Sequence, residues 1–324
     1  MTCEGPDLPH VNRKVRRNQR GKLLDEIESY WSTRTEGYSE VNHKELAGTQ
    51  KNAWLKVLTS QFPDKPKEEI RILDIGTGPG FFPVILAEAG YHVDAVDYTE
   101  GMLEKAKENA GDLCRNIRFL RMDAQKLDFE DNTFDVVISR NLTWNLEHPD
   151  VAYREWVRVL KVGGRLLNFD ANWYGYLYEE EQRKAYENDR KNVENNSLDD
   201  HYLCTDIERM ERIALQVPLS KISRPQWDVK TLREAGLLGI RTDTEIWKTV
   251  WSEEERLNYQ STPMFMVTGV KPDHFLNLPV AAGEKQKAFL SSEMENLSFL
   301  QPSSVEKILE KPFSSQQVFM QESM

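Results

Sequence analysis

Cysteine is scarce in this chain of 324 residues, and metal-binding patterns are missing. Cys3, Cys114 and Cys204 lie far apart, form no C-x-x-C pair and are odd in number, which argues against a disulfide framework. Zinc and iron sites use clustered histidines and cysteines, but the six histidines include no pair four residues apart. We therefore expect reduced thiols, no metal and a cytoplasmic location.

Long hydrophobic runs and an excess of positive charge are missing as well. The sequence contains no run of about 18 apolar residues, so no membrane span is predicted. Residues 1–22 lack the apolar core of a secretory signal and are expected to form a flexible N-terminus. The net charge is -11, whereas proteins that bind nucleic acid through its phosphates usually present a basic face. We expect neither a membrane nor a nucleic acid as a partner.

The pattern that organises the chain is a short apolar run that ends in three glycines at alternate positions. Residues 70–75 are rich in isoleucine and leucine, which is typical of a strand buried on both faces of a parallel sheet. Gly76, Gly78 and Gly80 follow, and residues 81–90 read as a helix with proline in its first turn and glycine past its end. Strand, glycine turn and helix predict a nucleotide-binding α/β unit, because glycine lets a ligand approach the backbone closely.

The spacing of these glycines distinguishes between classes of nucleotide. A dinucleotide fingerprint, G-x-G-x-x-G, requires glycine at position 81, where Phe81 stands. The pattern Asp74-x-Gly76-x-Gly78-x-Gly80 instead resembles motif I of the class I S-adenosylmethionine-dependent methyltransferases. The resemblance implies S-adenosyl-L-methionine as the cofactor.

Later features of this family follow in order. Asp97 ends the next predicted strand, 23 residues after Asp74, where both dinucleotide folds and these methyltransferases use an acid to accept hydrogen bonds from ribose hydroxyls. The family places a second acid, here Asp123, after the third strand to accept from the adenine amino group. The resemblance implies cofactor contacts by Tyr38, Asp74, Gly76, Gly78, Gly80, Asp97, Tyr98, Met102, Asp123, Ala124, Arg140 and Asn141.

The predicted elements define an α/β, doubly wound fold. Strands are expected at 70–75, 91–97, 117–120, 134–141 and 165–170, and residues 158–166 resemble the stretch before strand five in the type 11 methyltransferase group. Residues 240–250 and 264–270 are expected to pair as the last two strands. We expect a Rossmann-like seven-stranded sheet, mostly parallel with an antiparallel last strand, a helical N-terminal segment and a helical insertion after strand five.

The methyltransferase domain is expected to span residues 23–270, with its core at 70–170. In similar enzymes a segment like that around Tyr38 folds over the cofactor, although ordinary helix packing is the alternative here. Insertions at the place of residues 171–226 usually cover the substrate, but an oligomer interface or a plain surface helix stays open. Residues 271–324 are rich in polar residues and are expected to form a largely disordered tail.

The resemblance implies a small-molecule methyl acceptor. Candidate substrate contacts are Trp144, Asn172, Trp173, Tyr174 and Tyr178. A hydroxyl or carbon acid benefits from a general base, for which His148, Asp170 and His201 are candidates, whereas a neutral amine needs none. The acceptor atom, the use of a base and the oligomeric state stay open.

We therefore predict an enzyme that transfers the methyl group of S-adenosylmethionine by in-line displacement. One alternative is a non-catalytic member of the fold that binds the cofactor. A second, an NAD(P)-dependent oxidoreductase, is disfavoured because the third glycine and a Tyr-x-x-x-Lys motif are missing. A third alternative is a nucleic-acid methyltransferase. Amino-group DNA methyltransferases carry an Asn/Asp-Pro-Pro motif after strand four, but this chain has Arg140-Asn141-Leu142-Thr143 there, so the motif is missing.

Overall fold

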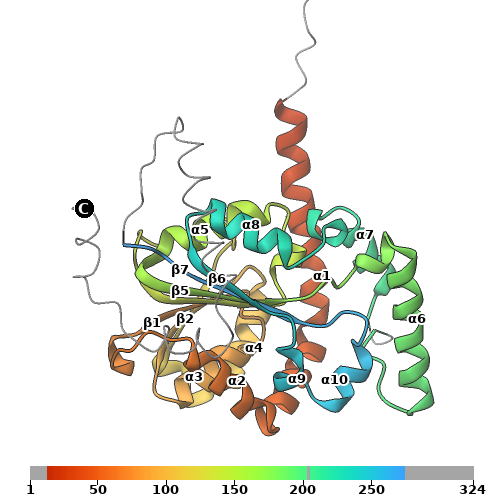
Figure 1. Cartoon of the computed structure of the whole chain (residues 1–324), viewed down its shortest axis with the longest axis horizontal. Coiled ribbons are helices and arrows are strands. Elements are labelled where there is room, and N and C mark those ends of the chain that lie inside the picture. Colours follow the sequence, from red (N-terminus) through yellow and green to blue (C-terminus); the bar gives the residue numbers. More distant parts are fainter. Residues whose placement is uncertain (1–12, 203–204, 274–324) are drawn as a thin grey trace, which may run out of the picture. The chain divides into compact units, whose positions relative to one another are not determined.

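The computed structural model describes residues 13–202 and 205–273, and a seven-stranded sheet forms its centre (Figure 1). The strands lie in the order β3-β2-β1-β4-β5-β7-β6. Their bounds are β1 Arg71–Ile75, β2 His92–Asp97, β3 Ile117–Arg121, β4 Phe134–Arg140, β5 Leu160–Asp170, β6 Leu238–Asp243 and β7 Phe265–Val270. The first five are parallel, and β7 runs antiparallel to both β5 and β6. The predicted fold class is confirmed.

Helices cover both faces of the sheet. The α-helices are α1 Arg13–Ala47, α2 Gln50–Ser60, α3 Phe81–Glu88, α4 Glu100–Ala110, α5 Pro149–Val159, α6 Glu180–Asn195, α7 Ile207–Ala214, α8 Gln226–Glu234, α9 Trp247–Val250 and α10 Glu253–Asn258. The 3-10 helices are η1 Lys67–Glu69, η2 Gly111–Asn116, η3 Thr143–Asn145, η4 Gly175–Leu177 and η5 Pro218–Lys221. Figure 1 shows α5 and α8 on one face and α2, α3 and α9 on the other. Among the described helices, none has the length and apolarity needed to cross a membrane.

The central strand β1 owes its place to its hydrophobicity. Ile72, Leu73 and Ile75 are buried, and β1 pairs with β2 on one side and β4 on the other. Leu73 and Ile75 contact the core under α5 and α8, whereas Ile72 contacts the core that holds Trp54 and Phe82 on the opposite face. The chain order reverses between β1 and β4, so the loops that follow these two strands diverge and leave a crevice between them.

The start of α1 differs from the sequence-based expectation. Residues 13–22, expected to be flexible, are the first turns of this helix. Leu23 and Ile27 are buried one turn apart, and a helix anchored there extends toward its N-terminus by one hydrogen bond per residue. Residues 1–12 and 274–324, including most of the expected disordered tail, lie outside the described residues.

The expected strand at 240–250 is wrong in its second half. β6 ends at Asp243, whose Oδ1 accepts a hydrogen bond from the Glu245 backbone N–H at 2.8 Å. Such a local Asx turn ends a strand. Ile246, the N-cap of α9, and Val250, its last residue, are buried four residues apart, a helical spacing that brings both into the same core cluster.

The insertion after β5 packs against α1. Residues 171–226 carry η4, α6, α7 and η5, and α7 contributes the buried Met210 and Ile213. These side chains form one apolar cluster with Leu23 and Ile27 of α1. Hydrophobic contacts therefore fix the insertion to the N-terminal helix.

Candidate active site

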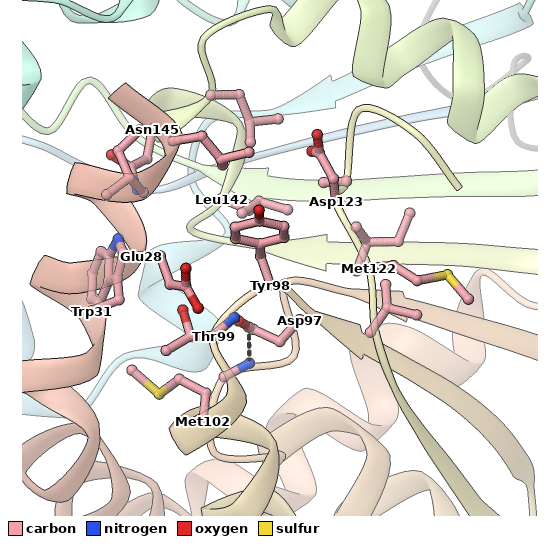
Figure 2. Close-up of a pocket in the computed structure, with 18 of the residues that line it drawn as sticks. Glu28, Trp31, Asp97, Tyr98, Thr99, Met102, Met122, Asp123, Leu142 and Asn145 are labelled. Carbon is pink, nitrogen blue, oxygen red and sulfur yellow. Dashed lines mark hydrogen bonds between the residues drawn. The ribbon is translucent and has the colours of Figure 1, made fainter. Parts of the chain in front are cut away.

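A pocket opens at the carboxyl ends of β1, β2 and β4 and is bounded on one side by α1 (Figure 2). The space in and around it amounts to about 880 Å³, which includes open solvent. Its lining comes from the glycine turn, the ends of β2 and β3, the loop after β4 and α1. Ligands of open α/β sheets bind at this edge, where the strand order reverses.

The glycine turn approaches the loop after β4 closely. Gly76, Gly78 and Gly80 have φ angles of 70°, 53° and 91°, which glycine adopts without strain. A Cβ at Gly76 would lie 2.8 Å from the end of the Leu142 side chain, so a larger residue there would displace Leu142. Gly76 and Gly78 line the pocket, whereas Gly80 lies against Ala106 of α4.

Asp97 holds the glycine turn from the end of β2. Its Oδ2 accepts a hydrogen bond from Gly78 N and its Oδ1 one from Thr99 N, both at 2.9 Å. Burial raises the pKa of Asp97, while the N–H donors of Thr99 and Gly78 oppose the shift. The Thr99 hydroxyl and the Tyr98 backbone N–H also interact with this carboxylate, which lines the pocket as an acceptor.

Asp74, the first residue of the motif, does not line the pocket. Its side chain is buried, and burial raises its pKa to about 7, while Thr77 and Arg140 act in the opposite direction. Its carboxyl group is therefore partly protonated near neutral pH.

The end of β3 forms the side of the pocket opposite α1. Asp123 and Ala124 line it together with Met122. Asp123 Oδ1 accepts hydrogen bonds from the backbone and side-chain nitrogens of Gln125, at 2.9 and 3.1 Å, and within the described part of the chain Oδ2 accepts none. Figure 2 shows Asp123 and Met122 across the pocket from Trp31. An acceptor is therefore available on this side.

The wall on the α1 side is mostly apolar. Leu24, Ile27, Glu28 and Trp31 project from neighbouring turns, and Tyr38 lies two turns further along. The rings of Trp31 and Tyr38 meet edge to face, with centroids 5.6 Å apart. The 3-4 spacing of the sequence predicted a helix here, but only packing shows that this face lines the pocket.

Arg140 lines the pocket but its charge is already matched. Its guanidinium donates two hydrogen bonds to the Glu45 carboxylate, at 2.7 and 3.0 Å, and lies 4.7 Å from the centre of the Phe81 ring. Burial alone would lower the pKa of Arg140, but Glu45 raises it above its ordinary value. Arg140 therefore stays charged and ties α1 to the end of β4.

The loop after β4 supplies several lining residues that the sequence analysis missed. Asn141 was predicted, and Leu142, Asn145, Leu146 and Glu147 join it. Asn141 has a φ of 57°, which turns the chain sharply at the end of the strand. The sequence feature that could have identified these residues is the position of this loop after a predicted strand, at the carboxyl edge of the sheet.

The predicted substrate residues pack beside the pocket and do not line it. Trp144 donates from Nε1 to Asn141 O at 3.0 Å and lies against Tyr174, with ring centroids 5.0 Å apart. Asn172 hydrogen-bonds to the backbone of Arg224.

The other two predicted substrate residues are also engaged elsewhere. Trp173 Nε1 donates to Asp170 Oδ1 at 3.0 Å. Tyr178 is 41% exposed, and its hydroxyl lies 3.3 Å from Leu215 O.

Asp170, one of the candidate bases, belongs to a fully buried ionic network. Its Oδ2 accepts hydrogen bonds from Thr143 Oγ1, Trp144 N and Arg224 Nη1, the last at 2.8 Å. Arg224 also donates a hydrogen bond to Asp228. Burial would lower the pKa of Arg224, but the carboxylates of Asp170 and Asp228 raise it well above its ordinary value. Asp170 therefore fixes the loop after β4 to the end of the insertion.

The two histidine candidates lie outside the pocket lining as well. His201 contacts Tyr259 Oη through Nδ1 and Glu254 Oε1 through Nε2, both at 2.9 Å. His148 Nε2 lies 3.6 Å from Glu147 Oε1. Among the described residues, no group of histidines, cysteines and acids is placed to hold a metal.

Known proteins resemble this chain in sequence and in fold. A family model described as a methyltransferase domain matches residues 73–168. The ubiquinone/menaquinone biosynthesis C-methyltransferase UbiE of Xanthomonas oryzae pv. oryzae is 30% identical over 178 residues, which are 52% of this chain and 68% of that protein. Demethylmenaquinone methyltransferase of Clavibacter sepedonicus is 41% identical over 98 residues, 30% of this chain and 39% of that protein.

A structure from Methanococcus maripaludis, provisionally assigned as an S-adenosyl-L-methionine-dependent methyltransferase, has the same fold. It superposes with a TM-score of 0.50 at 20% identity, covering 76% of this chain and 95% of that one. The chain thus belongs to the class I S-adenosylmethionine-dependent methyltransferases, as its motif I predicted. It spans 39% and 60% of the length of two demethylmenaquinone methyltransferases that it matches, those of C. sepedonicus and Bacteroides fragilis.

Proposed function

We propose that the protein binds S-adenosylmethionine in this pocket and transfers its methyl group to a small-molecule acceptor. The observation that carries the proposal is the placement of two acidic side chains, Asp97 and Asp123, on the pocket lining at the ends of β2 and β3, beside the glycine turn. Asp97 suits the ribose hydroxyls, and Asp123 suits the adenine amino group. Gly76 and Gly78 leave the backbone open to the rest of the cofactor.

The protein contributes to the reaction by positioning the two reactants and by excluding water from the pocket. When bound, S-adenosylmethionine supplies a methyl group already activated by the positive charge on sulfur. Leu24, Ile27 and Trp31 of α1 exclude water from the pocket, and the loop after β4 directs the acceptor. Positioning of this kind can lower a reaction barrier by up to about 7–11 kcal/mol.

We propose an acceptor that gives up its proton readily, because Asp170 and His201 are held by other side chains and His148 lies outside the pocket lining. The names of the relatives suggest a hydroquinone ring as the acceptor to test before others. A naphthohydroquinone, incubated with the protein and S-adenosylmethionine, is expected to yield a methylated product and S-adenosylhomocysteine.

The cofactor is tested by calorimetric titration of the full chain with S-adenosylmethionine. Asp97→Asn is expected to weaken binding at least about tenfold, because the amide presents an N–H donor to ligand hydroxyls. The matched control is Asp94→Asn, on the same strand but outside the pocket lining, which should leave binding unchanged. No binding by the unchanged chain would refute the proposal. Binding without any methyl transfer would favour the non-catalytic alternative, and binding of NAD instead would favour the oxidoreductase.

The domain boundaries are part of the proposal. We propose that residues 23–270 form the methyltransferase domain and that 171–226 cover the acceptor side of the site. The packing of α7 against Leu23 and Ile27 supports this assignment.

A further inference from the structure

A second pocket, the amino-end pocket, lies at the edge of the sheet where the parallel strands begin. Its lining comes from the starts of β1, β2, β3 and β4 and from η2, and it includes Arg71, His92, Arg115, Arg118 and Phe134. The candidate active site lies at the opposite ends of these strands. Since β1 has five residues, the two sites are on the order of 15 Å apart. The amino-end pocket is therefore a separate site.

The amino-end pocket carries more positive than negative charge, although the whole chain has a net charge of -11. Arg71, Arg115 and Arg118 line it, and among the described lining residues Asp94 supplies the one carboxylate. A guanidinium group stays protonated at neutral pH, so three positive charges against one negative charge leave a surplus of two. Like charges that are held close together repel, and an anion that binds among them removes the repulsion.

Two of the three guanidinium groups are held in place. Arg118 donates from Nε and Nη2 to the Asp94 carboxylate, at 2.9 and 2.6 Å, and Arg71 Nη2 lies 3.9 Å from Asp94 Oδ2. The Arg71 guanidinium also lies 5.3 Å from the centre of the Phe134 ring. A guanidinium has five N–H donors, so both groups keep donors for another acceptor while Asp94 fixes their positions.

The third guanidinium group, that of Arg115, has no partner. Its side chain is exposed and, within the described residues, forms no hydrogen bond, ion pair or ring contact. The same holds for the exposed ring of His92 at the start of β2. All five N–H donors of Arg115 are therefore available to a ligand in the pocket.

We propose that the amino-end pocket binds the phosphate group of a small phosphorylated compound. Guanidinium groups match the oxygens of phosphate through paired N–H···O hydrogen bonds. The three groups come from separate elements, β1, β3 and η2, so they suit a tetrahedral anion better than a planar carboxylate. The surplus of two positive charges equals the charge of a phosphate dianion. A long nucleic acid would also meet the negative charge of the rest of the chain.

The test is calorimetric titration of the full chain with inorganic phosphate and with pyrophosphate, at constant ionic strength because salt screens exposed charges. We expect saturable binding of one anion per chain, tighter for pyrophosphate because it carries more charge. Arg115→Gln should weaken binding at least about tenfold, since it removes hydrogen bonds between charged groups. The control Arg233→Gln removes an exposed arginine of α8 that, within the described residues, forms no ion pair and lies outside this pocket. It should leave the affinity unchanged.

S-adenosylmethionine serves as the probe for the other site. Arg115→Gln should bind it like wild type, and its presence at saturation should leave the affinity for phosphate unchanged. The proposal would be overturned by the absence of saturable binding of both anions up to about 10 mM. Equal weakening in Arg115→Gln and Arg233→Gln, with folding verified by circular dichroism, or competition between phosphate and S-adenosylmethionine would overturn it too.

A single-stranded oligonucleotide tests the other source of phosphate groups. If it bound more tightly than pyrophosphate and lost affinity in Arg115→Gln, the pocket would be part of a nucleic-acid surface and the proposal would be wrong. The proposed methyl transfer is tested independently. Failure of S-adenosylmethionine to bind, with phosphate bound as expected, would refute the proposed function and leave the anion site in place.

Discussion

Two carboxylates at the ends of strands in the same sheet have opposite surroundings. Asp97 lines the pocket, and the hydrogen bonds that it accepts come from uncharged groups, among them the backbone N–H groups of Gly78 and Thr99. Asp170 accepts from five donors: Thr143 Oγ1, Trp144 N, Ala171 N, Trp173 Nε1 and Arg224 Nη1. A carboxylate has about four acceptor sites, so Asp170 is saturated. The first group is available to a ligand, whereas the second holds the protein together.

The contrast separates the two sides of the site. On the side of β2 and β3, polar groups face the pocket and are only partly used within the protein. On the side of β5 and the insertion, the predicted substrate residues contact each other and the buried network. A candidate residue at the carboxyl edge of a sheet is therefore informative only together with the donors around it.

Removal of Arg224 should give the largest effect on stability. Arg224→Met leaves Asp170 and Asp228 buried without their cation and should lower the free energy of unfolding by about 3–5 kcal/mol, measured by urea denaturation. The exposed pair of Arg154 and Asp150 provides the control, because Arg154→Met should cost about 1 kcal/mol or less. Similar losses in both variants would contradict the structural role of the network.

The pH dependence of Asp74 should be the next largest effect. Its folded pKa of about 7 lies above its ordinary value of 3.8, so between these values the unfolded chain ionises while the folded state holds the proton. Wild type should therefore lose about 2–4 kcal/mol relative to Asp74→Asn as the pH rises from 4 to 7, with no further change above.

The control for this prediction is Asp135, whose pKa is shifted in the opposite direction. Burial acts against ionisation of Asp135, but Lys161 and Lys65 hold its pKa below the ordinary value. Asp135→Asn should be less stable than wild type at neutral pH, and the difference should shrink on acidification through the folded pKa. Urea denaturation at several pH values measures both variants. A parallel pH dependence in the two would contradict these assignments.

Glycine substitutions should sharpen the role of the turn. Gly76→Ala adds a Cβ 2.8 Å from Leu142 at a φ of 70°, so it should cost about 1–3 kcal/mol and weaken S-adenosylmethionine binding at least about tenfold. Gly90 also has a positive φ, of 92°, but an added Cβ there meets nothing within 4 Å. Gly90→Ala should cost about 1–2 kcal/mol and leave the affinity unchanged. Equal affinities in the two variants would show that the close approach at Gly76 is unimportant.

Tyr178 should give the smallest effect. Its side chain is 41% exposed and lies outside the pocket lining, so Tyr178→Ala should change stability by about 0.5 kcal/mol or less. Its affinity for S-adenosylmethionine should match that of wild type in the same titration. Loss of turnover with an acceptor in this variant would instead show that Tyr178 belongs to the substrate site. The side of β5 and the insertion would then also face a ligand.

The sheet and the glycine turn were predicted from local patterns in the sequence. The apolar run before Gly76 and the spacing to Asp97 depend on residues close in sequence, and the strands that they predict are present. The strand expected at 240–250 failed because the Asx turn at Asp243 and the helical burial of Ile246 and Val250 favour another structure.

The sequence by itself determined the motif, the order of the strands along the chain and the acids at the ends of β2 and β3, because each is set by short-range spacing. Tertiary structure decided which face of α1 lines the pocket, that Arg140 is matched by Glu45, and that Asp170 is saturated by Arg224. These outcomes depend on partners 95 and 54 residues away in sequence, and burial makes such partners energetically decisive. Spacing along the chain carries no record of which distant donor reaches a buried carboxylate.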